Sequence, residues 1–304
     1  MRTPIICPSR PSRPSHPAST AIALAAVIAL AAALPAQAAP ELGSAQTFAV
    51  LAGTTVTDAH SAPNPPTQIF GDLGTSPGAS ITGLFSGINV NGGTVHPNDA
   101  TAQAALIDAT TAYNALAGLA FGTNLTGQVM GSPGLTTLTP GVYRFDTSAQ
   151  LTGTLMLDFA TNPGSNFVFQ IGSTLTTAAD SFISVLNATA GSGIYWQIGS
   201  SATLGTGTDF AGNLLALTSV TLNPGAQILC GRAIGLNGAV TLTDNLVSAN
   251  CVGQDFGTGL VDGGSLGFSG GPVTPVPEPA TAMLFLTGLA GLAATRGKPA
   301  RNTP

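Results

Sequence analysis

The chain has 304 residues, with 8 basic and 13 acidic side chains and a formal net charge of −5. Between residues 39 and 275 its only Lys or Arg side chains are Arg144 and Arg232, against twelve acids, so this part carries a net charge near −10. Such a surface repels phosphate groups and is unsuited to nucleic acid. The carboxylates are scattered singly and no metal-ligand spacing occurs, so we predict no enzyme, no cofactor and no metal site.

The N-terminus has the pattern of an export signal. Basic residues precede an uncharged apolar run over residues 18–34, and the small residues Ala36 and Ala38 follow it. This order predicts a signal peptide over residues 1–38. The alternative is a membrane anchor, although the apolar run is short for a bilayer about 30 Å thick.

The next segment alternates like β-structure. From Leu42 to Thr57 apolar residues alternate with threonine, and short strands are expected over residues 67–74 and 81–95 between Gly, Pro and Asn turns. We assign residues 39–252 to one mainly β domain.

One stretch of this domain has a helical period. Apolar side chains recur at helical spacing at Ala102, Leu106, Ala109, Tyr113, Leu116 and Leu119. We predict a helix over about 98–120, with Asn98 or Asp99 as its N-cap and Gly122 at its end.

A repeat follows the helix. Residues 169–176 and 196–203 resemble each other at an offset of 27 residues, which is typical of a solenoid coil. Around them Thr or Ser alternates with apolar residues, so strand geometry sends the polar set to one outer face. This set is Thr152, Thr154, Thr174, Thr176, Ser201, Thr203, Ser219, Thr221, Thr241 and Thr243.

Two cysteines remain after the signal peptide. Cys230 and Cys251 are candidates for a disulfide, because an exported domain meets an oxidising compartment. Two unpaired thiols are the alternative.

The C-terminal part reads as a linker and a sorting tail. Residues 253–275 are rich in Gly, Ser and Pro and predict a flexible linker. The tail, residues 276–304, contains Pro277, Glu278 and Pro279, then an apolar run over 280–294 and a basic end. It resembles the PEP-CTERM sorting signal of Gram-negative bacteria. That resemblance implies export through the inner membrane, a membrane helix over about 280–294 and cleavage by an exosortase-type protease; a plain C-terminal membrane helix is the alternative.

The region from Ala45 to Val247 is similar to the ice-binding-protein-like domain family, DUF3494. The matching stretches are residues 47–52, 71–78, 138–143, 169–175 and 237–242. The resemblance implies a discontinuous, three-sided, right-handed β-solenoid with one long α-helix packed alongside. It also implies ice binding on a flat, weakly charged face of Thr, Ser and Ala.

Two functions of different classes therefore compete. The first is an exported ice-binding protein whose partner is the ice crystal surface. The second is a non-catalytic matrix protein or adhesin that binds extracellular polysaccharide, for which an exposed aromatic platform would be favourable. Tyr195 and Trp196 are adjacent in an expected strand, so at least one of them faces the core.

Overall fold

The computed structural model describes residues 42–60, 66–84, 89–251 and 266–270. The predicted signal peptide, the motif Pro277-Glu278-Pro279 and the predicted membrane helix lie outside these residues. Within the described ranges no helix is both long enough and apolar enough to cross a membrane.

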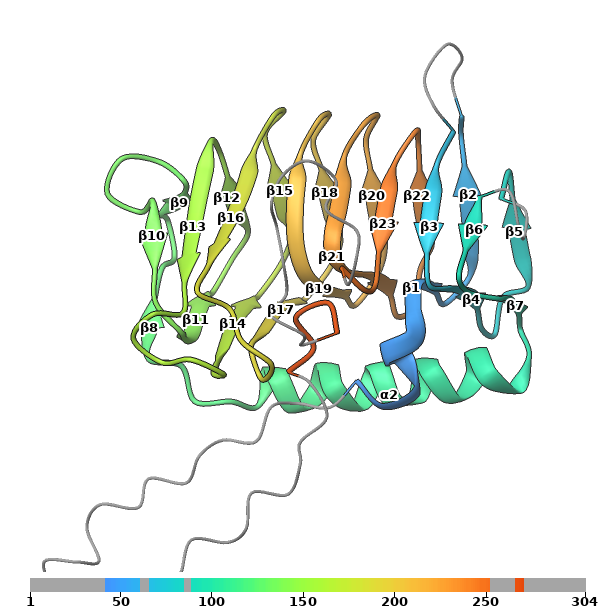
Figure 1. Cartoon of the computed structure of the whole chain (residues 1–304), viewed down its shortest axis with the longest axis horizontal. Helices are drawn as coiled ribbons and strands as arrows, with labels where there is room; N and C mark the ends of the chain where they lie inside the picture. The colour runs from blue at the N-terminus through green and yellow to red at the C-terminus, as the bar shows by residue number, and fades with distance from the viewer. Residues whose placement is uncertain (1–41, 61–65, 85–88, 252–265, 271–304) are drawn as a thin grey trace, which may run out of the picture. The chain divides into compact units, whose positions relative to one another are not determined.

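The described strands form two parallel sheets, of 15 and 8 strands, with one long helix beside them (Figure 1). Their pairings follow three ladders, and successive coils of the chain add strands, or parts of strands, to each ladder. Two ladders belong to the larger sheet because its longest strands, β19 (Asp209–Ala216) and β21 (Gln227–Gly235), take part in both.

The helix-side ladder contains, in order along the stack, β8 (Thr123–Asn124), β11 (Gly141–Phe145), β14 (Asn166–Ile171), β17 (Gly193–Ile198), the ends of β19 and β21, β1 (Phe48–Ala52), β4 (Asp72–Thr75) and β7 (Val95–Pro97). The short-strand sheet contains β9 (Val129–Met130), β12 (Ala149–Leu151), β15 (Leu175–Thr177), β18 (Ala202–Leu204), β20 (Val220–Leu222), β22 (Val240–Leu242), β2 (Thr55–Asp58) and β5 (Ser80–Thr82). The outer ladder contains β10 (Thr137–Leu138), β13 (Thr154–Asp158), β16 (Phe182–Leu186), the starts of β19 and β21, β23 (Leu246–Ser248), β3 (Gln68–Phe70) and β6 (Val90–Asn91).

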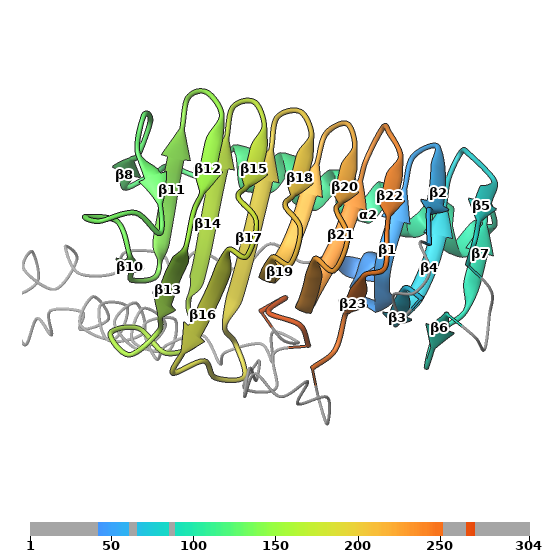
Figure 2. The ribbon, with the colours of Figure 1, turned by 90° about the horizontal axis from the view of Figure 1, so that it is seen from above.

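The stack is discontinuous in sequence. Strands β1, β2 and β3 each pair on one side with the last coil, through β21, β22 and β23. On their other side they pair with β4, β5 and β6 of the following coil. Figure 2 shows these blue N-terminal strands beside the orange C-terminal strands. The two sheets are therefore complete only when the first three strands of the domain pair with its last three.

Helix α2 (Ala100–Ala117) runs along the helix-side ladder. Asp99 caps it by accepting a hydrogen bond from the Ala102 N–H at 2.9 Å. The predicted helix was slightly too long, because the C-cap is Gly118 and not Gly122. Nε2 of Gln170 donates to the carbonyls of Leu116 and Leu119, both at 2.8 Å, which fixes this helix end to β14.

The strand expected from Leu42 is wrong at its start. Residues Gly43–Thr47 form a 3-10 helix, and β1 begins only at Phe48. The cause is a contact with α2: the N–H and the hydroxyl of Ser44 both donate to Oδ2 of Asp108, at 2.7 and 2.6 Å. These bonds turn the segment onto the helix.

Aromatic rings fill the interior between the ladders. Phe169 and Trp196 occupy equivalent positions on β14 and β17 and stack at 3.9 Å between ring centroids. The indole N–H of Trp196 donates to the Ala211 carbonyl at 3.0 Å, so its one polar atom is satisfied. The repeat detected in the sequence is thus a repeat of core positions.

The long strands bend where they leave the outer ladder for the helix-side ladder. Gly212 and Gly231 pair at this bend with φ values of 97° and 155°. A Cβ on Gly231 would lie 1.9 Å from the Gly212 carbonyl oxygen, so the close approach of the two strands requires glycine.

Two features fix the C-terminal end of the described chain to the domain. Cys230 and Cys251 form a disulfide, with Cα atoms 5.2 Å apart. Residues 266–270 fall within the predicted flexible linker, yet they lie against the domain with Phe268 fully buried. Burial of the Phe268 ring, together with main-chain hydrogen bonds to Ser192 and Ile194, offsets the conformational entropy that the segment loses when it is ordered.

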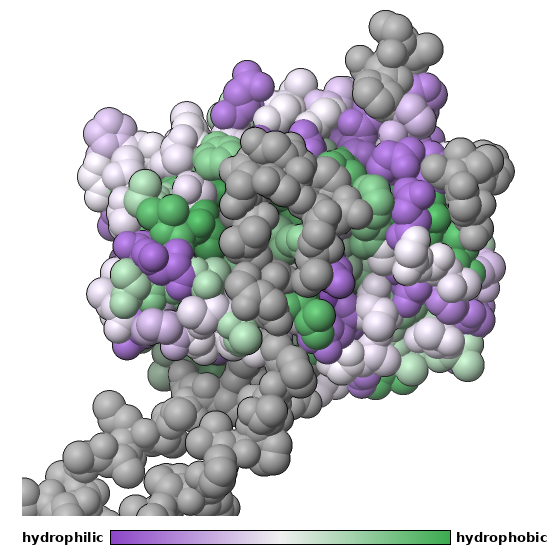
Figure 3. All heavy atoms as spheres, in the orientation of Figure 1, coloured by the Kyte–Doolittle hydropathy of each residue, from purple (hydrophilic) through white to green (hydrophobic). Residues whose placement is uncertain are grey.

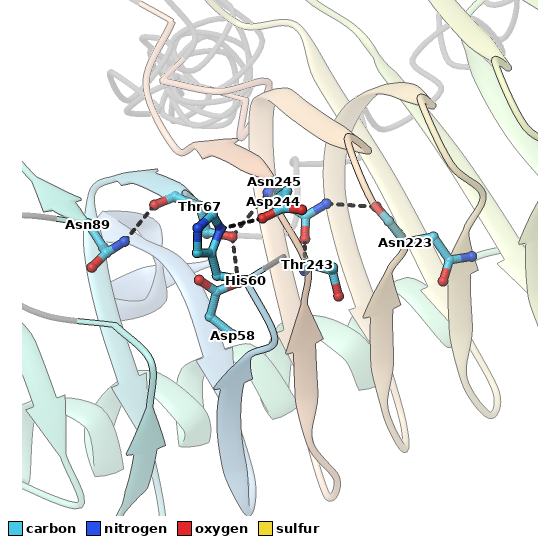
Figure 4. A network of polar contacts seen from close by, with 8 residues as sticks. All are labelled: Asp58, His60, Thr67, Asn89, Asn223, Thr243, Asp244 and Asn245. Carbon is cyan, nitrogen blue, oxygen red and sulfur yellow. Dashed lines mark hydrogen bonds and ion pairs between the residues drawn. The ribbon is translucent and has the colours of Figure 1, made fainter. Parts of the chain in front are cut away.

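A polar network joins the first and last coils (Figure 4). Nδ1 of His60, after β2, lies 2.6 Å from Oδ1 of Asp244, after β22. The Thr67 hydroxyl donates to Oδ1 of Asp58 at 2.7 Å and accepts from the Asn245 N–H at 3.0 Å. Burial raises the pKa of the Asp58 carboxyl; the Thr67 hydroxyl opposes this and the Asp244 carboxylate adds to it.

The Asp58 carboxyl gives a prediction on stability. Because its folded-state pKa is raised, its protonated form favours folding; this contribution is complete below the unfolded pKa of about 3.9 and is lost as the pH rises through the folded value. D58N cannot ionise and should lose this part of the pH dependence. Urea unfolding at about pH 4 and pH 7 measures it, and the stability of D58N relative to the wild type should increase with pH. A constant difference would contradict the assignment.

Candidate functional site

Six threonines form one row on the short-strand sheet. Register places Thr176 opposite Thr203, Thr203 opposite Thr221 and Thr221 opposite Thr241. The row continues through Thr57, opposite Thr241, to Thr82 at the edge. At about 4.8 Å between paired strands it extends over about 24 Å. We call these six residues the threonine row.

Each side chain of the threonine row points away from the core. The residues on either side of Thr203, Thr221 and Thr241 in the sequence are buried aliphatic side chains. The row itself is half-buried in its centre and exposed at Thr176 and Thr82. Among the described residues its hydroxyls make no hydrogen bond to another protein group, so they remain available to solvent.

A second row lies two residues earlier on each coil. This flanking row contains Thr174, Ser201, Ser219, Ala239, Thr55 and Ser80. Backbone hydrogen bonds align this row. The N–H of Leu175 donates to the Ser201 carbonyl, the N–H of Ala202 to the Ser219 carbonyl and the N–H of Val220 to the Ala239 carbonyl.

Three hydroxyls of the flanking row, those of Thr174, Ser201 and Ser219, form hydrogen bonds within the protein. Thr174 donates to the Ser148 hydroxyl at 2.8 Å. The Oγ atoms of Ser201 and Ser219 accept from the N–H groups of Ser219 and Ala239, at 3.4 and 3.3 Å. These bonds connect neighbouring coils, whereas the threonine row leaves its hydroxyls free.

Three predicted face residues lie elsewhere. Thr154 begins β13 and pairs with Phe182 in the outer ladder, so it belongs to another surface. Thr152 follows the end of β12, and Thr243 follows β22, where its N–H donates to Oδ1 of Asn245 at 2.5 Å. The alternation used to predict them breaks at the corner of each coil, where the chain leaves its strand.

The sequence prediction also missed Thr57 and Thr82. A signal existed, because Thr55-Val56-Thr57 and Ser80-Ile81-Thr82 have the same polar, apolar, threonine order as residues 174–176, 201–203 and 219–221. Only the pairing of the N-terminal coils with the last coil places these triplets in the same row.

The threonine row ends where the triplet changes. Gln150 lies opposite Thr176, and Val129 lies opposite Gln150 at the edge of the sheet. None of these outward positions carries a charge. In the described part of the chain no group of three or more His, Cys, Asp or Glu could hold a metal ion.

Other surfaces are less regular. On the outer ladder, Phe182, Asp209 and Gln227 follow one another at equivalent positions. Figure 3 shows this mixture as hydrophobic and hydrophilic residues side by side where the described atoms are visible. Tyr195 and Trp196 of β17 are both fully buried, so this strand presents no aromatic platform for a polysaccharide.

Comparison with known proteins identifies the family. Residues 50–248 match the model of the family described as Ice-binding-like. The chain belongs to this family. An ice-binding protein of Nostoc sp. (strain HG1) is 53% identical over 210 residues, which cover 69% of this chain and 74% of that protein.

Solved structures of ice-binding-like proteins have the same arrangement. The ice-binding protein from an Antarctic biological consortium is 39% identical, with a TM-score of 0.62 over 71% of this chain and 93% of that one. The ice-binding protein of Antarctomyces psychrotrophicus is 35% identical, with a TM-score of 0.62 over 69% and 98% of the two chains. Parallel sheets with one long helix are thus shared with these relatives.

The two rows should differ in what their hydroxyls contribute to stability. S219A removes a hydroxyl bonded to the next coil and should lower the free energy of unfolding by about 1 kcal/mol. T221V removes a hydroxyl without a protein partner, keeps the shape of the side chain and should cost less than about 0.5 kcal/mol. Urea unfolding of both variants measures the difference. Equal losses would mean that the rows share one role.

Proposed function

We propose that this domain adsorbs to ice through the threonine row. The observation that carries the proposal is a continuous row of six uncharged threonines whose hydroxyls make no hydrogen bond to any other group in the described part of the chain. Its membership of the Ice-binding-like family supports the same function.

The physical basis of the proposal is that the threonine side chains are held at regular positions before they meet ice. Parallel pairing on both sides holds most of the row at intervals of about 4.8 Å. Methyl groups limit the freedom of neighbouring water and hydroxyls hydrogen-bond to it, so water beside the row takes regular positions. A surface that is already rigid loses little conformational entropy when it binds.

We propose further that the coils wind as a right-handed, three-sided solenoid. Three ladders with the same order of coils support three sides. Connections between parallel strands of one sheet are right-handed in about 98% of cases, which supports the hand.

The proposed cellular setting is export from a Gram-negative bacterium. The sequence pattern of residues 1–38 supports passage through the inner membrane, and Pro277-Glu278-Pro279 supports processing by an exosortase-type protease. The domain would then act outside the cell, where it meets ice.

Ice-affinity partitioning of the exported chain tests the proposal. The protein should concentrate in slowly grown ice and shape the crystals, whereas a folded protein left in the liquid would contradict the proposed function.

Substitution locates the surface. T203Y places a bulky ring in the middle of the threonine row and should reduce ice partitioning at least tenfold, because the ring keeps neighbouring threonines from contact. T154Y is the matched control, since Thr154 is exposed on β13, outside the short-strand sheet. Circular dichroism checks that both variants fold. If T154Y alone lost partitioning, the outer ladder would be the ice-binding surface instead.

A further inference from the structure

A short segment beyond the family match is built into the domain. The match ends at residue 248, yet residues 266–270, which we call the strap, lie in the fold. Phe268 is 0% exposed and belongs to the main hydrophobic core. Ser269 forms an antiparallel bridge with Gly193, whereas all paired strands of the sheets are parallel.

Backbone bonds hold the strap along the start of β17. The Ile194 N–H donates to the Phe268 carbonyl at 2.9 Å, and the Gly270 N–H donates to the Ser192 carbonyl at 3.3 Å. Nδ2 of Asn213 donates to the same Phe268 carbonyl at 2.7 Å. The strap is therefore attached through its main chain as well as through its buried ring.

The buried Arg232 joins the strap to both halves of the chain. Its guanidinium donates to the Leu266 carbonyl at 3.0 Å, to the Ala249 carbonyl at 3.3 Å and, through Nε, to the Gln46 carbonyl at 2.9 Å. Oδ1 of Asn213 accepts from Nη1 at 2.5 Å. A buried guanidinium surrounded by acceptors is costly to uncover, so releasing the strap exposes Arg232.

The disulfide provides a second attachment before the strap. Cys251 follows β23, and its partner Cys230 lies within β21, which is paired on both sides. Without this bond, tension on residue 251 would pull first on β23, which has three residues, and then on β22 with Thr241. With the bond, that tension passes to a strand in the middle of the larger sheet.

The strap lies away from the threonine row. It contacts the start of β17 and the bend of β19 and β21, where the helix-side and outer ladders meet. The short-strand sheet has no strand in common with either ladder. In Figure 1 the red strap lies lower in the view than the short strands β15, β18 and β20.

We propose that the strap and the Cys230–Cys251 bond form a force-bearing anchor, through which the chain that follows the strap holds the domain against ice. The biological use of this anchor rests on the proposed function, because ice provides the opposing load and the cell surface holds the C-terminal end that processing leaves. The strap yields first under tension. The disulfide then keeps the load off the coil that carries Thr241.

Single-molecule pulling on the full exported chain tests this anchor without ice. One handle is attached at position 176 through a clickable amino acid, and the other at the C-terminus, so no added thiol disturbs the disulfide. The wild type should extend in two events, release of the strap and then unfolding at higher force. F268A should lose the first event, and reduction of the disulfide should lower the force of the second.

Controls separate the anchor from general destabilisation. F121A removes an aromatic side chain that is 46% exposed and should leave both events unchanged. If F268A does not fold, F268L carries the test and should release the strap at lower force. A first event that persists unchanged in F268A or F268L, or a second event insensitive to reduction, would overturn the proposal. Ice partitioning is measured separately, so failure here leaves the proposed function intact.

Discussion

The structure depends on parallel backbone pairing between its two ends. Strands β1, β2 and β3 lie between the last coil and the second coil, and each pairs on both sides. If this insertion failed, β21, β22 and β23 would become an exposed edge, and their unpaired N–H and C=O groups would favour aggregation. The row would also stop at Thr241. The same pairing of β1, β2 and β3 therefore completes the stack of coils and makes the threonine row continuous.

The candidate surface consists of two rows of similar residues whose hydroxyls have different roles. Ser201 and Ser219 use their hydroxyls to connect neighbouring coils, while Thr203 and Thr221 leave theirs free. Both rows lack charge, so neither holds the strong hydration shell of an ionised group. A surface of this kind has no charged groups with which to attract a ligand. What it offers is a set of hydroxyl and methyl groups that a rigid sheet holds at regular positions. This is what adsorption to an ordered solid requires.

Buried polar groups occur where separate parts of the chain meet. Arg232 contacts the N-terminal 3-10 helix, β19 and the strap, and Asp58 and Asp244 lie where the first and last coils join. Such groups cost desolvation energy unless every partner is in place, so they penalise incorrect assembly more than they add stability. In a solenoid of similar coils, we expect this penalty to disfavour pairing between the wrong coils.

The sequence alone determined that the fold is mainly β with one helix and contains a core repeat at residues 169 and 196, because local periodicity reports which side chains are buried. It also placed four residues of the threonine row on one predicted outer face. It failed where long-range contacts decide. Thr57 and Thr82 joined the row only through pairing with a coil nearly two hundred residues away, and Thr154 left it because the chain turns a corner after β12. The strap looked like a linker because five residues carry no periodic pattern. Its place is set by the space and the hydrogen-bond partners that the folded domain offers to Phe268, and these exist only in the tertiary structure.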